Sequence, residues 1–238
     1  MSGRKQFDVT LALDRAMRVF WERGYADASL DALGAATGLG RGSFYGAFGS
    51  KDALFRQCLD RYAATYGARY EHALGAHPGE PMRAVEAFFD VVLARIADPA
   101  LPAGCLIAQS AAQAPTLREE NAARVRALLD AQRARVRAAL ADTTTAAGAA
   151  DTADAGSTTA TDAPAAADAP AAPDAPAPDP QTLDDLACYV VAVNQSLAVL
   201  SRAGAAPADL RAVARLACTT VADTLARASA RPSPVPST

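Results

Sequence analysis

Apolar side chains recur every three or four residues through most of this chain, which is the spacing of one face of an α-helix. The first run consists of Val9, Leu13, Ala16, Met17 and Phe20. We expect this helix to end at Gly24, because glycine readily adopts the left-handed conformation that terminates helices. No segment shows the two-residue alternation typical of a strand, so the predicted fold class is all-α.

Two short helices joined by a glycine turn are predicted next. Ser29 can cap a helix over 30–37, which Gly38 ends, and a second helix follows over 41–48. The small core expected between these helices consists of Tyr25, Leu30, Leu33, Phe44 and Phe48. This arrangement is the outline of a helix-turn-helix, the module that lays its second helix in the DNA major groove.

The remaining periodic segments predict six further helices. Ser50 can cap a long helix that begins at Lys51 and continues to about Leu74. The other five are predicted over 82–97, 106–113, 117–140, 183–202 and 207–228. Thr116 is expected to cap the arginine-rich helix over 117–140, with Glu119 placed to complete a capping box.

The chain is accordingly divided into five parts. Residues 142–180 contain Ala, Asp, Thr and Pro with no large apolar side chain, so we interpret them as a disordered insertion. The predicted parts are a DNA-binding domain over 1–62, the first part of a helical effector domain over 63–141, the insertion over 142–180, dimerisation helices over 181–229 and a disordered tail over 230–238.

Charge changes this picture through its distribution. The formal net charge of −3 argues against general attraction to nucleic acid. Basic residues nevertheless narrowly outnumber acidic ones up to Tyr62, and no Lys or Arg occurs between Asp142 and Asp185. A basic region at one end and an acidic segment far from it are compatible with DNA binding.

Cellular location is predicted from two missing signals. The first ten residues lack the apolar core of a signal peptide. No uninterrupted run of about 18 apolar residues is present to span a bilayer, and the best candidate, 189–200, contains Asn194, Gln195 and Ser196. We therefore expect a cytoplasmic protein.

The cysteines and histidines predict no metal site. The four cysteines, Cys58, Cys105, Cys188 and Cys218, have no CxxC spacing, so reduced thiols are expected. His72 and His77 fall at a helix end and in a loop, without a convergent carboxylate or thiol pair. No metal and no cofactor is expected.

Residues 20–55 resemble the DNA-binding domain of the TetR family of transcriptional regulators. The matching pieces are FWERGY and SLDALGAATGLGRGSFYGAFGSKDAL. The resemblance implies an N-terminal helix-turn-helix domain followed by a helical domain for ligand binding and dimerisation. It further implies a regulator that binds double-stranded DNA at a palindromic operator, as a homodimer, because one short helix reads too few bases to be selective.

Six residues of this segment are expected to contact DNA: Ser29, Thr37, Arg41, Ser43, Tyr45 and Lys51. Ser29, Tyr45 and Lys51 offer hydroxyls and a cation to phosphates, which position the protein. Arg41 is the best candidate to read a base, because a guanidinium matches O6 and N7 of guanine, with Ser43 and Thr37 beside it. Plainer roles stay open: Ser29 as a cap only, Tyr45 as packing and Arg41 as a phosphate contact.

The last two helices and the middle helices carry the remaining predictions. The homodimer interface is expected among Tyr189, Val193, Leu197, Leu200, Leu210, Val213, Leu216, Val221 and Leu225, some of which must instead fill the core of one subunit. The family resemblance implies a small-molecule pocket, with Phe88, Phe89, Val92, Leu106, Ile107, Gln109, Gln113, Tyr189 and Asn194 as candidates. Cys105 is a candidate redox or electrophile sensor, or else a small buried side chain.

These observations predict a dimeric repressor that a small-molecule signal releases from its operator, with an electrophile or an oxidant as one candidate class of signal. Two alternatives stay open. One is an enzyme with Cys105 as nucleophile, although neither histidine is placed to be its partner. The other is a DNA-binding protein without an effector, although such proteins usually show a basic excess that this chain lacks.

Overall fold

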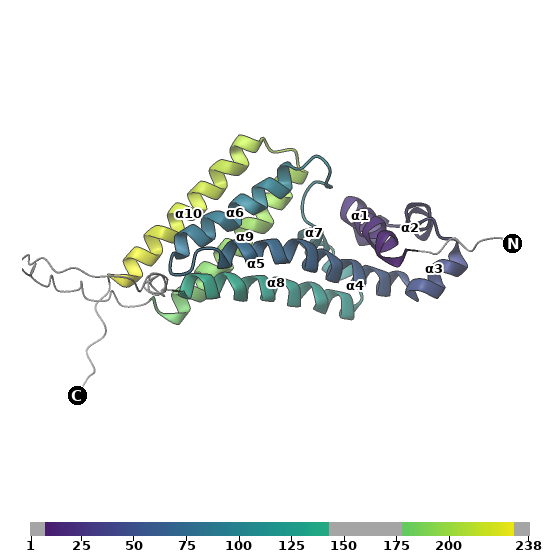
Figure 1. Ribbon diagram of the computed structural model, residues 1–238, viewed down its shortest axis with the longest axis horizontal. Coiled ribbons are helices and arrows are strands. Elements are labelled where there is room, and N and C mark those ends of the chain that lie inside the picture. Colours follow the sequence, from purple (N-terminus) through teal and green to yellow (C-terminus); the bar gives the residue numbers. More distant parts are fainter. Residues whose placement is uncertain (1–7, 143–177, 231–238) are drawn as a thin grey trace, which may run out of the picture.

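A computed structural model describes residues 8–142 and 178–230, and within these residues the chain is helical with no strand. Figure 1 shows the first three helices at one end of an elongated bundle formed by the helices that follow. We call residues 9–48 the head and the helices that follow the body. Most of the predicted insertion and nearly all of the predicted tail lie outside the described residues.

The head consists of α1 (Val9–Asp27), α2 (Leu30–Thr37) and α3 (Arg41–Phe48), as the apolar pattern predicts. Asp8 caps α1 by accepting from Leu11 N–H, and Ser29 caps α2 by accepting from Ala32 N–H. The predicted end of the first helix at Gly24 is wrong by three residues. Gly24 lies at a kink, with φ 80° and ψ 173°, and a last helical turn follows it.

A continuous rod leads from the head into the body. It comprises α4 (Lys51–Tyr62), a π-helical turn η1 (Ala63–Gly67) and α5 (Ala68–Gly75), and Ser50 caps it by accepting from Ala53 N–H at 3.0 Å. The sequence predicted this length to within one residue but not the π turn. Such turns are rare and are often found at functional sites.

The rest of the body is built from α6 (Pro81–Ala97), α7 (Leu106–Ala112), the 3₁₀ turn η2 (Ala114–Thr116), α8 (Glu119–Ala141), α9 (Pro180–Arg202) and α10 (Pro207–Ser229). Thr116 does not cap α8, contrary to the prediction. Its hydroxyl donates to the Gln113 carbonyl at 2.8 Å inside η2, and Leu117 is extended, so the helix begins two residues late with Arg118 as its N-cap.

Helix α9 alone among the described helices is long and apolar enough to cross a membrane, with a mean hydropathy of 1.3 over its most apolar window. The best apolar run in the sequence, 189–200, lies within this helix and was rejected as a span because Asn194, Gln195 and Ser196 interrupt it. In the fold α9 packs against α8 and α10, and Val190 and Leu197 are fully buried. This packing accounts for its apolar face.

An aromatic core joins the head to the body. Trp21 of α1 is fully buried and packs edge-on against Tyr62 and Tyr66, with ring centroids 4.9 and 5.3 Å away. Phe20 makes a similar contact with Phe55 at 4.9 Å. The body therefore supports α1 through side chains of α4 and η1, which fixes the position of the helix-turn-helix.

Candidate DNA-binding surface and effector cavity

The exposed face of α3 is held in place by the residues on its opposite face. Phe44 and Phe48 are buried and pack against each other with ring centroids 5.6 Å apart. Arg41, Ser43 and Tyr45 are exposed, and the Tyr45 side chain is 48% accessible although it is a large aromatic. Three of the six predicted DNA contacts are therefore accessible on α3.

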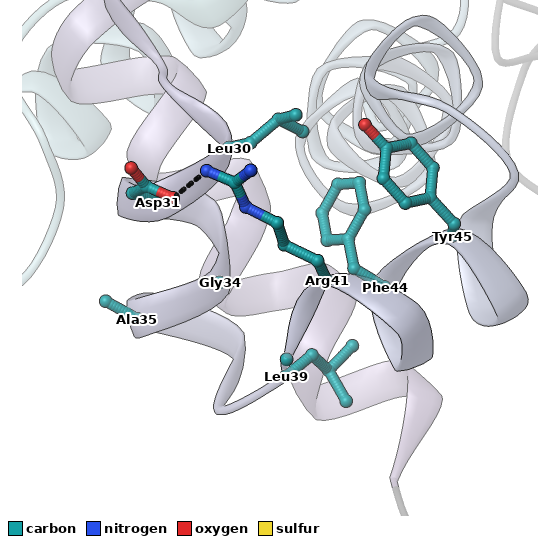
Figure 2. A pocket seen from close by; sticks show the side chains of 9 residues that line it. Leu30, Asp31, Gly34, Ala35, Leu39, Arg41, Phe44 and Tyr45 are labelled. Carbon is teal, nitrogen blue, oxygen red and sulfur yellow. Dashed lines mark hydrogen bonds and ion pairs between the residues drawn. The ribbon is translucent and has the colours of Figure 1, made fainter.

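Arg41 forms an ion pair across the two helices. Its Nη2 lies 3.1 Å from Oδ1 of Asp31 in the first turn of α2, and the two side chains are 74% and 80% exposed (Figure 2). The pair borders a hollow of about 230 Å³ between α2 and α3, lined by Leu30, Leu39 and Phe44 among others. Asp31 was not among the residues predicted to bind DNA, although it lies in the first turn of α2 and contacts the first residue of α3.

Ser29 and Lys51 flank this face from neighbouring helix starts. Ser29 caps α2 and is exposed, so its hydroxyl stays accessible for a phosphate contact as well. Lys51 is half-buried, with Nζ 4.5 Å from the centre of the Tyr25 ring and 3.5 Å from the Ala26 carbonyl. Burial lowers the pKa of Lys51, against the opposing effect of Asp52.

Thr37 is the one predicted DNA contact that is turned inward. It is buried, and its hydroxyl donates to the carbonyl of Leu33 at 2.8 Å. A hydroxyl near the end of a short helix often bonds to its own preceding turn in this way. Thr37 is therefore not accessible for the DNA contact beside Arg41 that the sequence predicted.

Two glutamines of the α7 region hold the kink of α1. Gln113 Oε1 accepts from Tyr25 N–H at 2.9 Å. The Gln109 amide, in the orientation that satisfies both of its atoms, donates to the Trp21 carbonyl at 2.6 Å and accepts from Gly24 N–H at 3.0 Å. Both residues were predicted to bind a ligand, but here they satisfy the backbone groups that the kink leaves without helical partners.

Further contacts hold α1 and α4 against α8 and α9. Asp52 accepts from the Tyr25 hydroxyl at 2.7 Å and from Asn121 of α8 at 3.0 Å, and it pairs with Arg118 at 3.1 Å. Burial, followed by the Asp52 bond, raises the pKa of Tyr25 to about 12. Arg202, the last residue of α9, donates to the Trp21 and Glu22 carbonyls.

A narrow cavity of about 30 Å³ lies inside the body between α4, α5, α8 and α9. It holds roughly two water molecules at most. Cys105 and Tyr62 border it, and the Tyr62 hydroxyl donates to Cys105 Sγ at 3.3 Å. Asn194 and Gln195 also border it. Two buried amide oxygens, Asn194 Oδ1 and Gln195 Oε1, have no hydrogen-bond partner among the described residues.

Only some of the predicted pocket residues line this cavity. Asn194 and Ile107 do so, and Cys105, the separate sensor candidate, lines it too. Phe88, Val92 and Leu106 are core residues with at most 1% exposure, and Phe89 borders a separate groove between α6 and α10. Tyr189 is half-buried on α9 and does not line the cavity. Apolar periodicity identified the buried faces but not the place where packing is incomplete.

A buried cation lies behind the cavity wall. Arg95 of α6 is 5% exposed, donates from Nε to the Tyr70 hydroxyl at 2.8 Å and from Nη1 to the Gly104 carbonyl, and its guanidinium faces Trp21 at 5.8 Å. Burial raises the pKa of Tyr70 to about 12, against the lowering effect of Arg95. This cluster was not predicted from the sequence, because an arginine in a helix ordinarily faces solvent.

Comparison with known proteins places this geometry in a family. The family model described as "Bacterial regulatory proteins, tetR family" matches residues 12–58, which cover the head and the start of α4. The whole fold is similar to that of a cysteine mutant of the TetR family transcriptional regulator CifR complexed with 26-bp double-strand operator DNA. That match has a TM-score of 0.68 and 28% identity, and it covers 92% of this chain and 98% of the other. Residues 12–58 thus match the TetR family model, and the whole fold is similar to that of a TetR-family regulator.

Curated relatives of this chain agree with that match. The HTH-type transcriptional repressor ComR of Escherichia coli is 36% identical over 103 residues, 43% of this chain and 49% of ComR. An HTH-type transcriptional regulator of Bacillus subtilis, YezE, is 34% identical over 111 residues, 47% of this chain and 57% of YezE. These matches span about half the length of each relative. The family and the all-α fold predicted from the sequence are thus confirmed.

Proposed function

We propose that this protein is a dimeric repressor that binds a palindromic operator through α3 and releases it in response to a small-molecule signal. The observation that carries the proposal is the exposed face of α3 with Arg41, Ser43 and Tyr45, fixed from behind by Phe44 and Phe48. The similarity to CifR, whose structure was determined with operator DNA, supports double-stranded DNA as the partner.

Each exposed group has a role that its chemistry suits. In the proposal, Arg41 reads guanine through two parallel hydrogen bonds, and Ser43 contacts a neighbouring base or phosphate. Tyr45, Ser29 and Lys51 bind phosphates on either side of α3, which sets the register of the helix in the groove. The partly buried Lys51 has less freedom than a surface lysine, so its ammonium is already near its binding position.

The homodimer is proposed to form through α9 and α10. Both helices expose large apolar side chains: Val199, Leu200 and Leu216, the last of them 66% exposed. Of the residues predicted for this interface, Leu197, Leu210 and Val221 fill the core of the subunit instead. Pairing of two subunits would cover the exposed residues and place two recognition helices on one duplex.

Arg41→Ala should reduce discrimination between the operator and an unrelated duplex by roughly 5- to 150-fold for each recognition helix, because a bidentate contact to guanine is worth about 1–3 kcal/mol. Tyr45→Phe should weaken binding to both duplexes, because it removes a phosphate contact that carries no sequence information. Fluorescence anisotropy with DNA from beside the protein's own gene measures both effects.

The matched control for Arg41 is Arg83→Ala. Arg83 is an exposed arginine at the start of α6 that likewise forms an ion pair, with Glu80 at 3.0 Å. It should leave binding unchanged. Equal operator affinity in the wild type and in Arg41→Ala would contradict the proposed role of α3.

The proposed signal acts at the cavity through Cys105. The thiol borders the cavity and is bonded to Tyr62, whose ring packs against Trp21 of α1, so a group added to the sulfur would displace side chains that support the head. N-ethylmaleimide, which adds a thiol across its double bond, should therefore release wild-type protein from DNA. Cys105→Ser should remain bound after the same treatment.

Cys188→Ser is the control for this experiment, because Cys188 is an exposed thiol on α9 and does not line the cavity. Mass spectrometry of the intact protein should show that Cys188 reacts first and without release. Release that persists in Cys105→Ser but is lost in Cys188→Ser would contradict the assignment. Turnover of a substrate by wild type, combined with no DNA binding, would favour the enzyme alternative.

A further inference from the structure

We infer that Asp31 is a specificity-determining residue, which positions Arg41 and opposes binding to DNA that lacks the correct base. The inference rests on the proposed function of α3. Asp31 does not contact the base in this scheme, so it acts through Arg41 and is a positioning residue.

The geometry places a carboxylate on the surface proposed to meet DNA. Figure 2 shows the Arg41 side chain directed from the start of α3 toward Asp31 on α2, with Tyr45 on the other side of the Phe44 ring. Both members of the pair are largely exposed, and they border the hollow between the two helices. An acidic group at this position repels phosphates, so we expect Asp31 to have a compensating role in DNA binding.

Helix capping does not explain Asp31. Ser29 already supplies the side-chain cap of α2, accepting from Ala32 N–H at 3.1 Å. A carboxylate in the first turn of a helix stabilises it through the macrodipole by about 0.3–1 kcal/mol, which any first-turn acid would provide. The bond to Arg41 is therefore the specific interaction of Asp31.

The strength of the pair suits a selective role. An exposed ion pair changes an equilibrium by less than about fivefold, whereas a bidentate contact to guanine is worth about 5- to 150-fold. Guanine in the correct position can bind two of the five N–H donors of Arg41 while another keeps the contact with Asp31, so the carboxylate stays neutralised by its partner. A phosphate on an unrelated duplex that draws Arg41 away leaves the carboxylate free and facing the duplex, so non-specific binding is weakened more than operator binding.

Asp31→Asn tests the inference through the ratio of operator affinity to non-specific affinity. We expect non-specific binding to strengthen about three- to tenfold, with a steeper dependence on salt equivalent to roughly one more phosphate contact. Operator binding should strengthen less, so the ratio should fall at least about threefold. Anisotropy titrations with an operator duplex and a scrambled duplex, at several salt concentrations, measure these quantities.

Three further variants separate the mechanism from a general charge effect. Asp31→Glu keeps the charge and should retain the wild-type ratio. Asp130→Asn removes the same charge from an exposed ion pair with Arg133 on α8, and it should change neither affinity nor salt dependence. In an Arg41→Ala background, Asp31→Asn should no longer change the ratio.

Two results would overturn the inference while leaving the proposed function intact. One is an unchanged ratio in Asp31→Asn. The other is an equal change with and without Arg41, which would make Asp31 a general charge and not a partner of Arg41. Wild-type protein that binds both duplexes equally would overturn the proposed function itself, and the inference with it.

Discussion

Gly24→Ala is expected to lower the free energy of unfolding by about 3 kcal/mol. Gly24 has φ 80° and ψ 173°, a region that is essentially restricted to glycine and costs other residues about 1–3 kcal/mol. An added Cβ would also overlap the Gln113 amide and lie 3.0 Å from the amide of Gln109. Urea denaturation followed by circular dichroism measures the loss.

The strain and the overlap can be separated in a double-mutant cycle. In a Gln113→Ala background the overlap is removed, so Gly24→Ala should cost about 1 kcal/mol less than in the wild type. Gly46→Ala is the control, since nothing lies within 4 Å of its added Cβ and it sits inside α3. That change should stabilise the protein by about 0.5–1 kcal/mol. Equal effects of the two alanines would refute the account of the kink.

The Gly24 contacts also bear on how a signal reaches DNA. Gln109 lies on α7, and Gln113 is the residue directly after that helix. Cys105 directly precedes α7 and accepts a hydrogen bond from the Tyr62 hydroxyl at the cavity. A change at the cavity that moves α7 therefore moves the backbone of α1 at the kink. If the proposed signal follows this route, Gln113→Ala should keep operator binding but weaken release.

The local structure of the head was predictable because its signals are local. Ser29 and Gly38 mark the two ends of α2, and the spacing of Phe44 and Phe48 fixes the inner face of α3, so both helices were predicted to the residue. Exposure of Arg41 and Tyr45 followed from the same period. Thr37 was wrong because its position alone does not reveal that its hydroxyl bonds to its own helix.

The long-range contacts were not predictable from one sequence. The bond from Tyr25 N–H to Gln113 joins residues 88 positions apart, and the Arg95 cluster joins three separate segments. Amides and guanidinium groups carry no periodic signal that distinguishes a bond to a distant backbone from exposure to solvent or contact with a ligand. For the same reason the sequence could not predict the position of the cavity, which depends on where the packed helices leave space.

Trp21→Ala is expected to cost about 3–5 kcal/mol of unfolding free energy, the usual loss when a large aromatic leaves a packed core. Trp21 is fully buried, with Tyr62, Tyr66 and Arg95 against its ring, so its removal leaves a large cavity among these side chains. The variant should also lose operator binding at temperatures where the wild type is folded, because α1 depends on this contact for its position.

Trp21→Phe should cost far less, within about 1.5 kcal/mol of the wild type. The indole Nε1 is buried and, among the described residues, has no hydrogen-bond partner, so the wild type already bears the cost of an unsatisfied donor. Phenylalanine removes that donor together with part of the apolar surface, and the two effects oppose each other. Circular dichroism is the appropriate readout, because Trp21 is the single tryptophan of the chain and both variants lose its fluorescence. Equal losses in the two variants would show that the indole N–H contributes a bond, and the packing account of Trp21 would then be wrong.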